Sequence, residues 1–223
     1  MFAIDHAATA LLVKRRYPSV PLAPLLISVQ AMELAWVGFN YLGIERTTTE
    51  AEVRSVADIH LISMPYSHSV GTALAASLLA WLILEYGLNK PLLGRAVGFG
   101  IASHLVLDLA THARDIVLWP GVQEPKLGLG LYAVAPMLAF AIECAYGALC
   151  WFVYRGSWGL LTLICVGNLA NLSILSPAIP GPEEYLANRP LTIVTFIFVQ
   201  IVVTLVLTDL LARPRAAQAA VIR

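Results

Sequence analysis

The sequence predicts an all-α membrane protein: a polytopic helix bundle of about six transmembrane helices with a short N-terminal helix before them, forming one domain over residues 1–223. Two observations support this prediction. Hydrophobic residues make up 59% of the chain and charged residues only 13%, with a mean hydropathy of +0.77, whereas soluble domains average about 25% charged residues. The apolar residues also gather into stretches close to the roughly 20 residues that a helix needs to cross a bilayer.

The first apolar stretch, residues 2–13, is too short for a full span. We expect it to form a half-helix, an interfacial helix or a helix that packs inside the bundle. The longer stretches that follow cover residues 21–43, 65–87, 94–113, 129–154, 157–178 and 190–211. Polar, turn-rich connections lie between them, over residues 45–64 and over residues 177–190, where prolines prevent a helix from continuing. We expect the tail, residues 212–223, to be frayed.

Loop charges predict how the bundle lies in the membrane. If the basic cluster Lys14-Arg15-Arg16 is cytoplasmic, the loops on its side hold more lysines and arginines than the loops on the other side, in agreement with the positive-inside rule. The cytoplasmic set is then Lys14, Arg15, Arg16, Lys90, Arg95, Arg155, Arg213, Arg215 and Arg223.

Composition also limits the partners. The chain has 14 basic and 14 acidic residues, so it offers no basic stripe to neutralise phosphates, and nucleic acid is not an expected partner. The cysteines, Cys144, Cys150 and Cys165, lie in apolar runs and do not form the pattern of a disulfide framework. The expected partner is the lipid bilayer.

The most informative motif lies in the third apolar stretch, at residues 103–112. His104, Asp108 and His112 recur every four residues, and each step of four turns a helical side chain by only ~40° and raises it by ~6 Å. All three therefore share one face. Ionisable groups at membrane depth are costly and usually serve a function there. Two imidazoles and a carboxylate on one stripe indicate a divalent metal site, with zinc as the expected ion.

Other ionisable residues lie within reach of this stripe. His68 begins the second span on the side where the third span ends, as a further ligand or as an interfacial histidine, while Glu33 is a mid-span carboxylate that could bind the metal or act as general base. His6 reaches the site only if its segment folds into the bundle. We expect His60 to be a solvated loop residue, and Glu143 to be either structural or functional. The candidate metal ligands are thus His6, His68, His104, Asp108 and His112, and the candidate catalytic carboxylates are Glu33 and Asp108.

These motifs make the chain resemble the YdjM-like group of bacterial membrane-bound, metal-dependent hydrolase-like proteins. The resemblance is carried by Asp5-His6, the Glu33 segment, residues 65–69, 103–112, Arg114-Asp115, 118–121, 126–131, Glu143 and residues 169–172. It implies a multi-span protein of the bacterial inner membrane with a metal site at His6, His68, His104 and Asp108. The group usually has Asp after Pro in its first full span, where this chain has Glu33 after Met32.

Three functions from different classes follow as hypotheses. The first is a membrane-embedded metallohydrolase, in which metal-activated water attacks an ester, phosphoester or amide bond of a lipid or lipid-linked substrate. The second is a transporter or permease for a metal ion or protons, because intramembrane His, Asp and Glu residues also form relay chains. The third is a non-catalytic membrane subunit whose polar groups hold helices together or dock a partner.

Overall fold

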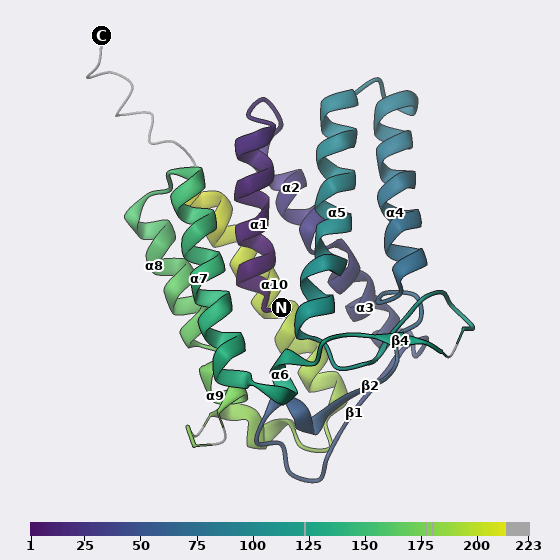
Figure 1. The fold of residues 1–223 in the computed structure, drawn as a ribbon, viewed down its shortest axis with the longest axis vertical. Coiled ribbons are helices and arrows are strands. Elements are labelled where there is room, and N and C mark those ends of the chain that lie inside the picture. Colours follow the sequence, from purple (N-terminus) through teal and green to yellow (C-terminus); the bar gives the residue numbers. More distant parts are fainter. Residues whose placement is uncertain (123, 177, 180, 213–223) are drawn as a thin grey trace.

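A computed structural model describes residues 1–122, 124–176, 178–179 and 181–212, and it confirms the predicted all-α helical bundle (Figure 1). The longer helices are α1 (Ala3–Arg16), α2 (Leu22–Val29), α3 (Ala31–Tyr41), α4 (Val70–Leu82), α5 (Pro91–Thr111), α7 (Pro136–Tyr154), α8 (Trp158–Leu169) and α10 (Pro190–Ala212). The short helical turns are η1 (Val56–Asp58), η2 (Ile83–Gly87), α6 (Leu131–Val134), α9 (Leu172–Leu175) and η3 (Pro182–Leu186). The tail that we expected to be frayed lies outside the described residues from residue 213 onward.

Among the described residues, four helices are long and apolar enough to cross a membrane: α4 with its π-helical continuation η2, then α5, α7 and α10. The bent pair of α2 and α3 brings the count to five if it is taken as one span, so the expectation of six full spans is wrong. The stretch 157–178 is not one span, because α8 ends at Leu169, where the Asn171 side chain donates to the Gly167 carbonyl and satisfies a helix-end acceptor. These apolar helices indicate an integral membrane protein.

Helix α1 lies in the middle of the bundle, which settles the alternatives for the short N-terminal stretch in favour of packing inside. It contacts α2, α5, α7, α8 and α10 (Figure 1). Nearly all of it is buried, and the alanines at 3, 7, 8 and 10 allow the neighbouring backbones to approach closely. One consequence is that the polar side chains of α1, including His6, are carried into the centre of the protein.

A break between α2 and α3 shapes this centre. The two helices meet at an angle of 56°, and Gln30 at the break donates from its side-chain amide to the Ala3 carbonyl of α1, at 2.8 Å. The break leaves the carbonyl of Val29, the last residue of α2, without the next turn of its helix. It also places Glu33 on the first turn of α3, on the inner side of the bundle.

A close approach at Gly100 brings α2 against α5. A side chain at this position would have its Cβ only 2.0 Å from the Ser28 hydroxyl oxygen and 3.0 Å from the Ser28 Cβ. The absence of a side chain at Gly100 therefore allows the last turn of α2 to lie beside the His104 turn of α5.

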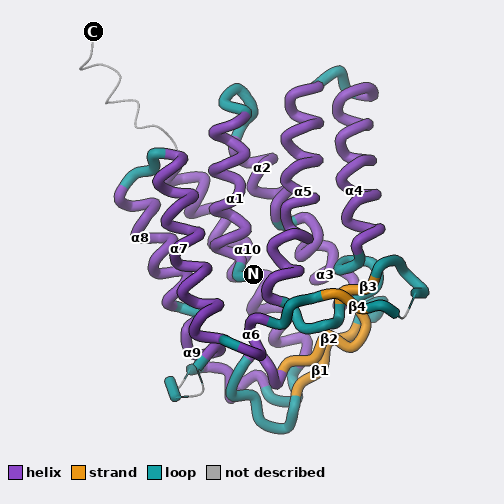
Figure 2. The backbone as a smooth tube through the Cα atoms, in the orientation of Figure 1, coloured by secondary structure: helices purple, strands orange, loops and turns teal. Residues whose placement is uncertain are grey.

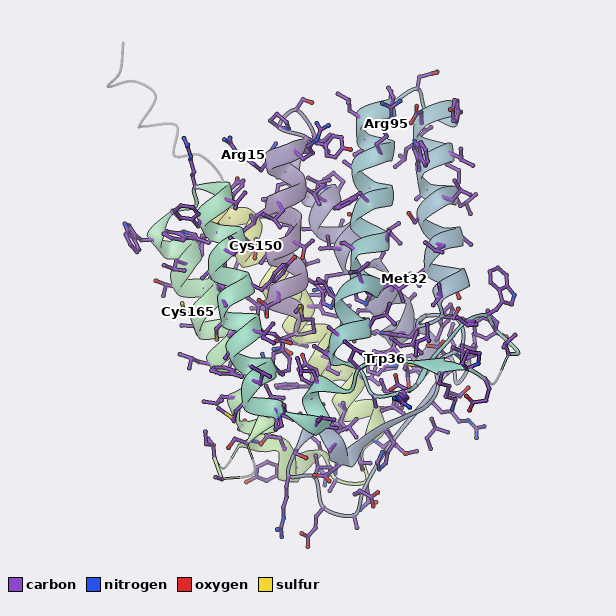
Figure 3. The ribbon with its side chains drawn as sticks, viewed as in Figure 1. Arg15, Met32, Trp36, Arg95, Cys150 and Cys165 are labelled. Atoms are coloured by element: carbon purple, nitrogen blue, oxygen red, sulfur yellow. The ribbon has the colours of Figure 1, made fainter. Side chains whose placement is uncertain are left out.

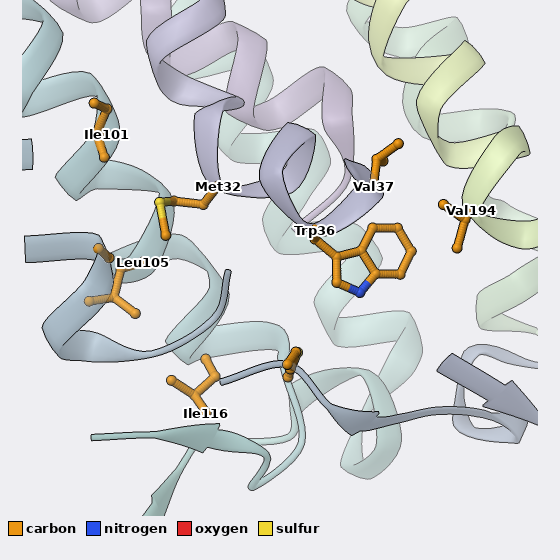
Figure 4. Packing of buried hydrophobic residues seen from close by; sticks show 9 residues of the cluster. Met32, Trp36, Val37, Ile101, Leu105, Ile116 and Val194 are labelled. Carbon is orange, nitrogen blue, oxygen red and sulfur yellow. The ribbon is translucent and has the colours of Figure 1, made fainter. Parts of the chain in front are cut away.

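Strands close one end of the bundle (Figure 2). The stretch 45–64, expected as a polar, turn-rich loop, contains an antiparallel hairpin in which β1 (Arg46–Thr49) pairs with β2 (Ile59–Ser63), with Thr48 opposite His60. A second small pair joins β3 (Ile116–Val117) to β4 (Lys126–Leu127). Beneath these strands lies an apolar cluster in which Trp36 of α3 points toward Val194 of α10 (Figure 4).

The opposite end carries basic residues. Figure 3 labels Arg15 and Arg95 there, and the described members of the expected cytoplasmic set lie at the ends of α1, α5 and α7 on this side (Figure 3). Arg213, Arg215 and Arg223 lie outside the described residues. With the predicted orientation, the strand-covered end faces away from the cytoplasm.

Candidate metal centre

Four side chains from three parts of the chain meet in the half of the bundle nearest the strands. Glu33 comes from α3, His68 from the turn before α4, and His104 and Asp108 from α5, and one ligand atom of each lies within 4.8 Å of all the others. The Nε2 atom of His104 is 2.9 Å from Asp108 Oδ2 and 3.8 Å from Glu33 Oε2. The Nε2 atom of His68 is 3.2 Å from Glu33 Oε2 and 3.6 Å from Asp108 Oδ2. We call these four residues the metal centre.

These separations suit a four-coordinate ion. Ligand atoms about 2.0–2.1 Å from a tetrahedral zinc ion lie about 3.3 Å from one another. The four imidazole–carboxylate separations in the metal centre, from 2.9 to 3.8 Å, fall on both sides of that value, and all the ligand atoms lie within 4.8 Å of one another. Two imidazole nitrogens and two carboxylate oxygens are also a donor set that suits zinc and related divalent ions.

A backbone carbonyl fixes the tautomer of His104. Its Nδ1 atom is 2.9 Å from the carbonyl oxygen of Val29, the atom that the break after α2 leaves available. A carbonyl can only accept a hydrogen bond, so the proton of the neutral imidazole is on Nδ1. The lone pair is then on Nε2, which faces the metal centre.

The tautomer of His68 is fixed by a longer chain of contacts. The Ser67 hydroxyl donates a hydrogen bond to the Glu45 carboxylate at 2.5 Å. The same hydroxyl lies 2.8 Å from His68 Nδ1 and accepts the proton that this nitrogen carries. Glu45 is buried and also accepts from the backbone N–H groups of Tyr66 and Ser67. His68 Nε2 is therefore also a lone-pair donor directed at the centre.

Asp108 has a different set of contacts on each carboxylate oxygen. Oδ1 accepts from His6 Nε2 at 3.1 Å and from the amino group of Met1 at 2.8 Å, and that amino group also donates to Thr111. Oδ2 is directed toward His104 and His68. His6 thus positions Asp108, and its ring stacks on that of His104 with centroids 4.1 Å apart.

The strongest indication of a metal site is a set of buried atoms without hydrogen bonds. His68 Nε2, His104 Nε2 and Asp108 Oδ2 are buried, and within the described ranges they have no hydrogen-bond partner of acceptable geometry. A buried polar atom without a partner costs about 1–3 kcal/mol. Three such atoms around one point, all able to donate an electron pair, fit a divalent metal ion.

The remaining predicted histidines lie farther out. His112 ends α5 in an extended conformation, with Nε2 4.0 Å from Asp108 Oδ2 and Nδ1 3.3 Å from Asp115. Its ring centroid is 5.2 Å from that of His68, so it borders the centre without belonging to the four-residue group. His60 is exposed on β2 and contacts Glu50 at 2.8 Å.

A cavity of about 430 Å³ adjoins the metal centre. Glu33, His68 and His112 line it together with the apolar residues Trp36, Phe196 and Ile197 and with further apolar and polar residues. We call it the side cavity. Glu33 is 21% exposed, whereas the side chains of Asp108, His104 and His68 are 2–3% exposed, so Glu33 is the member of the centre that a molecule in the cavity would meet first.

A second polar group lies on the other side of α1. Asp5 and Glu143 are fully buried, and Tyr132 donates to one oxygen of Glu143. Both oxygens of Asp5 and the other oxygen of Glu143 have no hydrogen bond of acceptable geometry among the described residues. Asp5 and His6 are neighbours in the sequence, but Asp5 lies beside Gly147 of α7, whereas His6 stacks on His104 of α5. Glu45 and Ser67 are likewise absent from the predicted site, although the hydroxyl next to His68 was a usable signal.

Comparison of the chain with protein-family models, with curated proteins and with solved structures finds no match. The fold and the site together define the class of this protein: a helical membrane protein with a His/carboxylate centre able to hold a metal ion.

Proposed function

We propose that this protein is an integral-membrane, metal-dependent hydrolase that cleaves an ester, phosphoester or amide bond of a lipid or lipid-linked substrate. The observation that carries the proposal is the convergence of His68 Nε2, His104 Nε2 and Asp108 Oδ2, which lack hydrogen bonds among the described residues, next to a largely apolar cavity that His68 and Glu33 line. The donor types favour zinc as the ion.

The residues of the metal centre would have different roles in the reaction. His68, His104 and Asp108 would hold the ion, and when bound such an ion makes water a usable nucleophile by lowering its pKa from about 15.7 to about 7. Glu33, the carboxylate exposed to the side cavity, is placed to accept a proton from water and to pass it to the leaving group. His6 and the Met1 amino group, which Thr111 also accepts from, hold Asp108 in position.

The cellular setting belongs to the same proposal. The resemblance to the YdjM-like group supports residence in a bacterial inner membrane. The predicted orientation supports a substrate taken from the outer leaflet, because the metal centre lies in the half of the bundle covered by the strands.

Activity of the purified protein in nanodiscs, measured on a panel of fluorogenic lipid esters, phosphoesters and amides, tests the proposal. We expect chelation to abolish turnover and added zinc to restore it. Glu33→Gln should keep its metal, because three ligands remain, and lose about 10²-fold or more in rate. Turnover that survives chelation, or a fully active Glu33→Gln protein with bound metal, would contradict the hydrolase proposal.

One observation favours a second candidate, a proton or metal ion transporter. The buried carboxylates Asp5 and Glu143 extend the row of buried ionisable groups beyond the metal centre. Toward the basic end, however, the buried residues of α1 become apolar, at Ala10, Leu11 and Val13. Zinc or proton flux into proteoliposomes that Glu143→Gln abolishes would replace the hydrolase by the transporter.

A further inference from the structure

The side cavity is lined by residues of the metal centre, of α10, of the α8–α9 region and of the strand-covered end of the bundle. One face of α10 lines it, with Ile193, Phe196, Ile197 and Gln200 at helical spacing. Ala170 and Ile174, from the α8–α9 region, lie on the same wall. Because α10 is apolar enough to be a membrane span, the outer surface of this wall lies against lipid.

Two wall residues are exposed on that surface. Phe196 is 50% exposed, and Ala170 is also exposed, yet both line the cavity. Ile193, in contrast, is 1% exposed and faces only the interior. The cavity therefore reaches the lipid-facing surface between the α8–α9 region and α10.

A polar contact marks the edge of this opening. Gln200 of α10 donates from its side-chain amide to the Asn171 side chain at 2.9 Å, and Asn171 is itself held by its bond to the Gly167 carbonyl. Both residues line the cavity. Farther along α10, toward Pro190, the wall consists of the apolar side chains of Ile197, Phe196 and Ile193. Apolar side chains can separate without leaving polar atoms unsatisfied.

We propose that the side cavity binds one acyl chain of a membrane lipid, which reaches it from the bilayer between Ala170 and Phe196. The chain lies along Ile197 and Trp36, and its ester end lies beside Glu33 and His68. This inference deepens the proposed function by naming its substrate class, and it rests on that function only for the bond that is cleaved.

The chemistry of the walls selects this occupant. Pockets of about 300–1,000 Å³ hold small ligands, and they take their selectivity from a few polar groups on otherwise apolar walls. Here Glu33 and His68 are the polar groups that the metal centre contributes, and Ile193, Phe196 and Ile197 give the α10 wall beside the lipid its apolar surface. A ligand that matches has a polar end and a long apolar chain, and the bilayer supplies acyl chains at the opening itself.

Quenching of Trp36 by brominated lipid tests the proposal. Trp36 lines the cavity but is only 2% exposed, so ordinary bilayer contact does not reach it. The reporter protein keeps Trp36 and has Phe in place of the other tryptophans, Trp81, Trp119, Trp151 and Trp158. A matched control keeps only Trp158, which is 77% exposed. Both are placed in nanodiscs of phospholipid brominated near the ester, near the chain end, or not at all.

Because a pocket surrounds most of its ligand, we expect lipid brominated near the ester to lower Trp36 fluorescence roughly twofold or more. Lipid brominated near the chain end should lower it less. Ala170→Phe, a change at an exposed position, should obstruct the opening and restore the Trp36 signal, while the Trp158 control keeps its quenching. Equal Trp36 fluorescence in all three lipids, with Trp158 quenched, would overturn the proposal.

Two further measurements separate this inference from the proposed function. Asp108→Ala should lose metal and still show Trp36 quenching, because the chain binds to apolar walls. A protein that hydrolyses lipid esters without Trp36 quenching would keep the hydrolase function and refute the acyl-chain site. Relief of quenching by small amounts of unbrominated polyprenyl phosphate, but not by equal amounts of phospholipid, would refute the acyl identity of the chain.

Discussion

The Ser67 hydroxyl offers the sharpest test of how the centre is oriented. It accepts the Nδ1 proton of His68 at 2.8 Å and donates its own proton to Glu45 at 2.5 Å. Ser67→Ala therefore removes the group that fixes the tautomer and the ring angle of His68. The other hydrogen bonds to Glu45, from the N–H groups of Tyr66 and Ser67, stay in place. The loss is therefore confined to the support of one ligand.

Loss of such outer-shell support usually lowers metal affinity about 10–100-fold. At about 1.4 kcal/mol for each factor of ten, this corresponds to roughly 1.4–2.8 kcal/mol. We expect Ser67→Ala to weaken zinc binding within that range without abolishing it, because His104, Asp108 and Glu33 keep their contacts.

Competition of the detergent-purified protein with a zinc-binding dye measures this affinity. Ser69→Ala is the matched control: Ser69 caps α4 by accepting from the Thr72 N–H, and its loss should cost about 1 kcal/mol of stability without changing zinc affinity. If Ser67→Ala binds zinc as the wild type does, or if Ser69→Ala weakens zinc binding equally, the assigned support of His68 is wrong.

The remaining predictions concern the packing around the centre. Gly100→Ala should lower the free energy of unfolding by about 1–3 kcal/mol, because its Cβ would meet Ser28. Gly38→Ala, which has open space around it, should be neutral or stabilising. Thermal unfolding compares the two variants, and equal losses would contradict the close approach at Gly100. His6→Ala should weaken zinc binding about 10–100-fold by releasing Asp108, and unchanged affinity in the dye assay would refute this role. Gln200→Leu should lower thermal stability by about 0.6–1.7 kcal/mol through loss of the Asn171 contact, and an unchanged unfolding midpoint would show that the contact contributes nothing.

Local periodicity was enough to predict part of the site. The four-residue spacing of His104 and Asp108 puts both side chains on one face of α5, as the structure shows. The chain direction also places the start of α4 and the end of α5 on one side, which brings His68 close to Asp108. Both inferences depend only on helical geometry and on the alternation of spans.

Other features depend on contacts between distant residues. The Val29 carbonyl serves His104 across 75 positions of the chain, and it is available only because the helix breaks at Gln30. The pattern of apolar residues continues through this break and through the end of α8, which is why it predicts too many full spans. Hydropathy likewise gives no sign that α1 occupies the middle of the bundle, since close packing of its alanines decides that position.

Elemental analysis of the protein purified without added chelator tests the central claim most directly. The wild type and Asp108→Ala, expressed and purified in parallel, are analysed for zinc and other divalent metals. With four donors that converge within 4.8 Å, the wild type should carry about one divalent ion per chain, and Asp108→Ala should carry much less. A wild-type protein that neither carries nor takes up a divalent ion, or an Asp108→Ala protein with its full content, would contradict the metal centre.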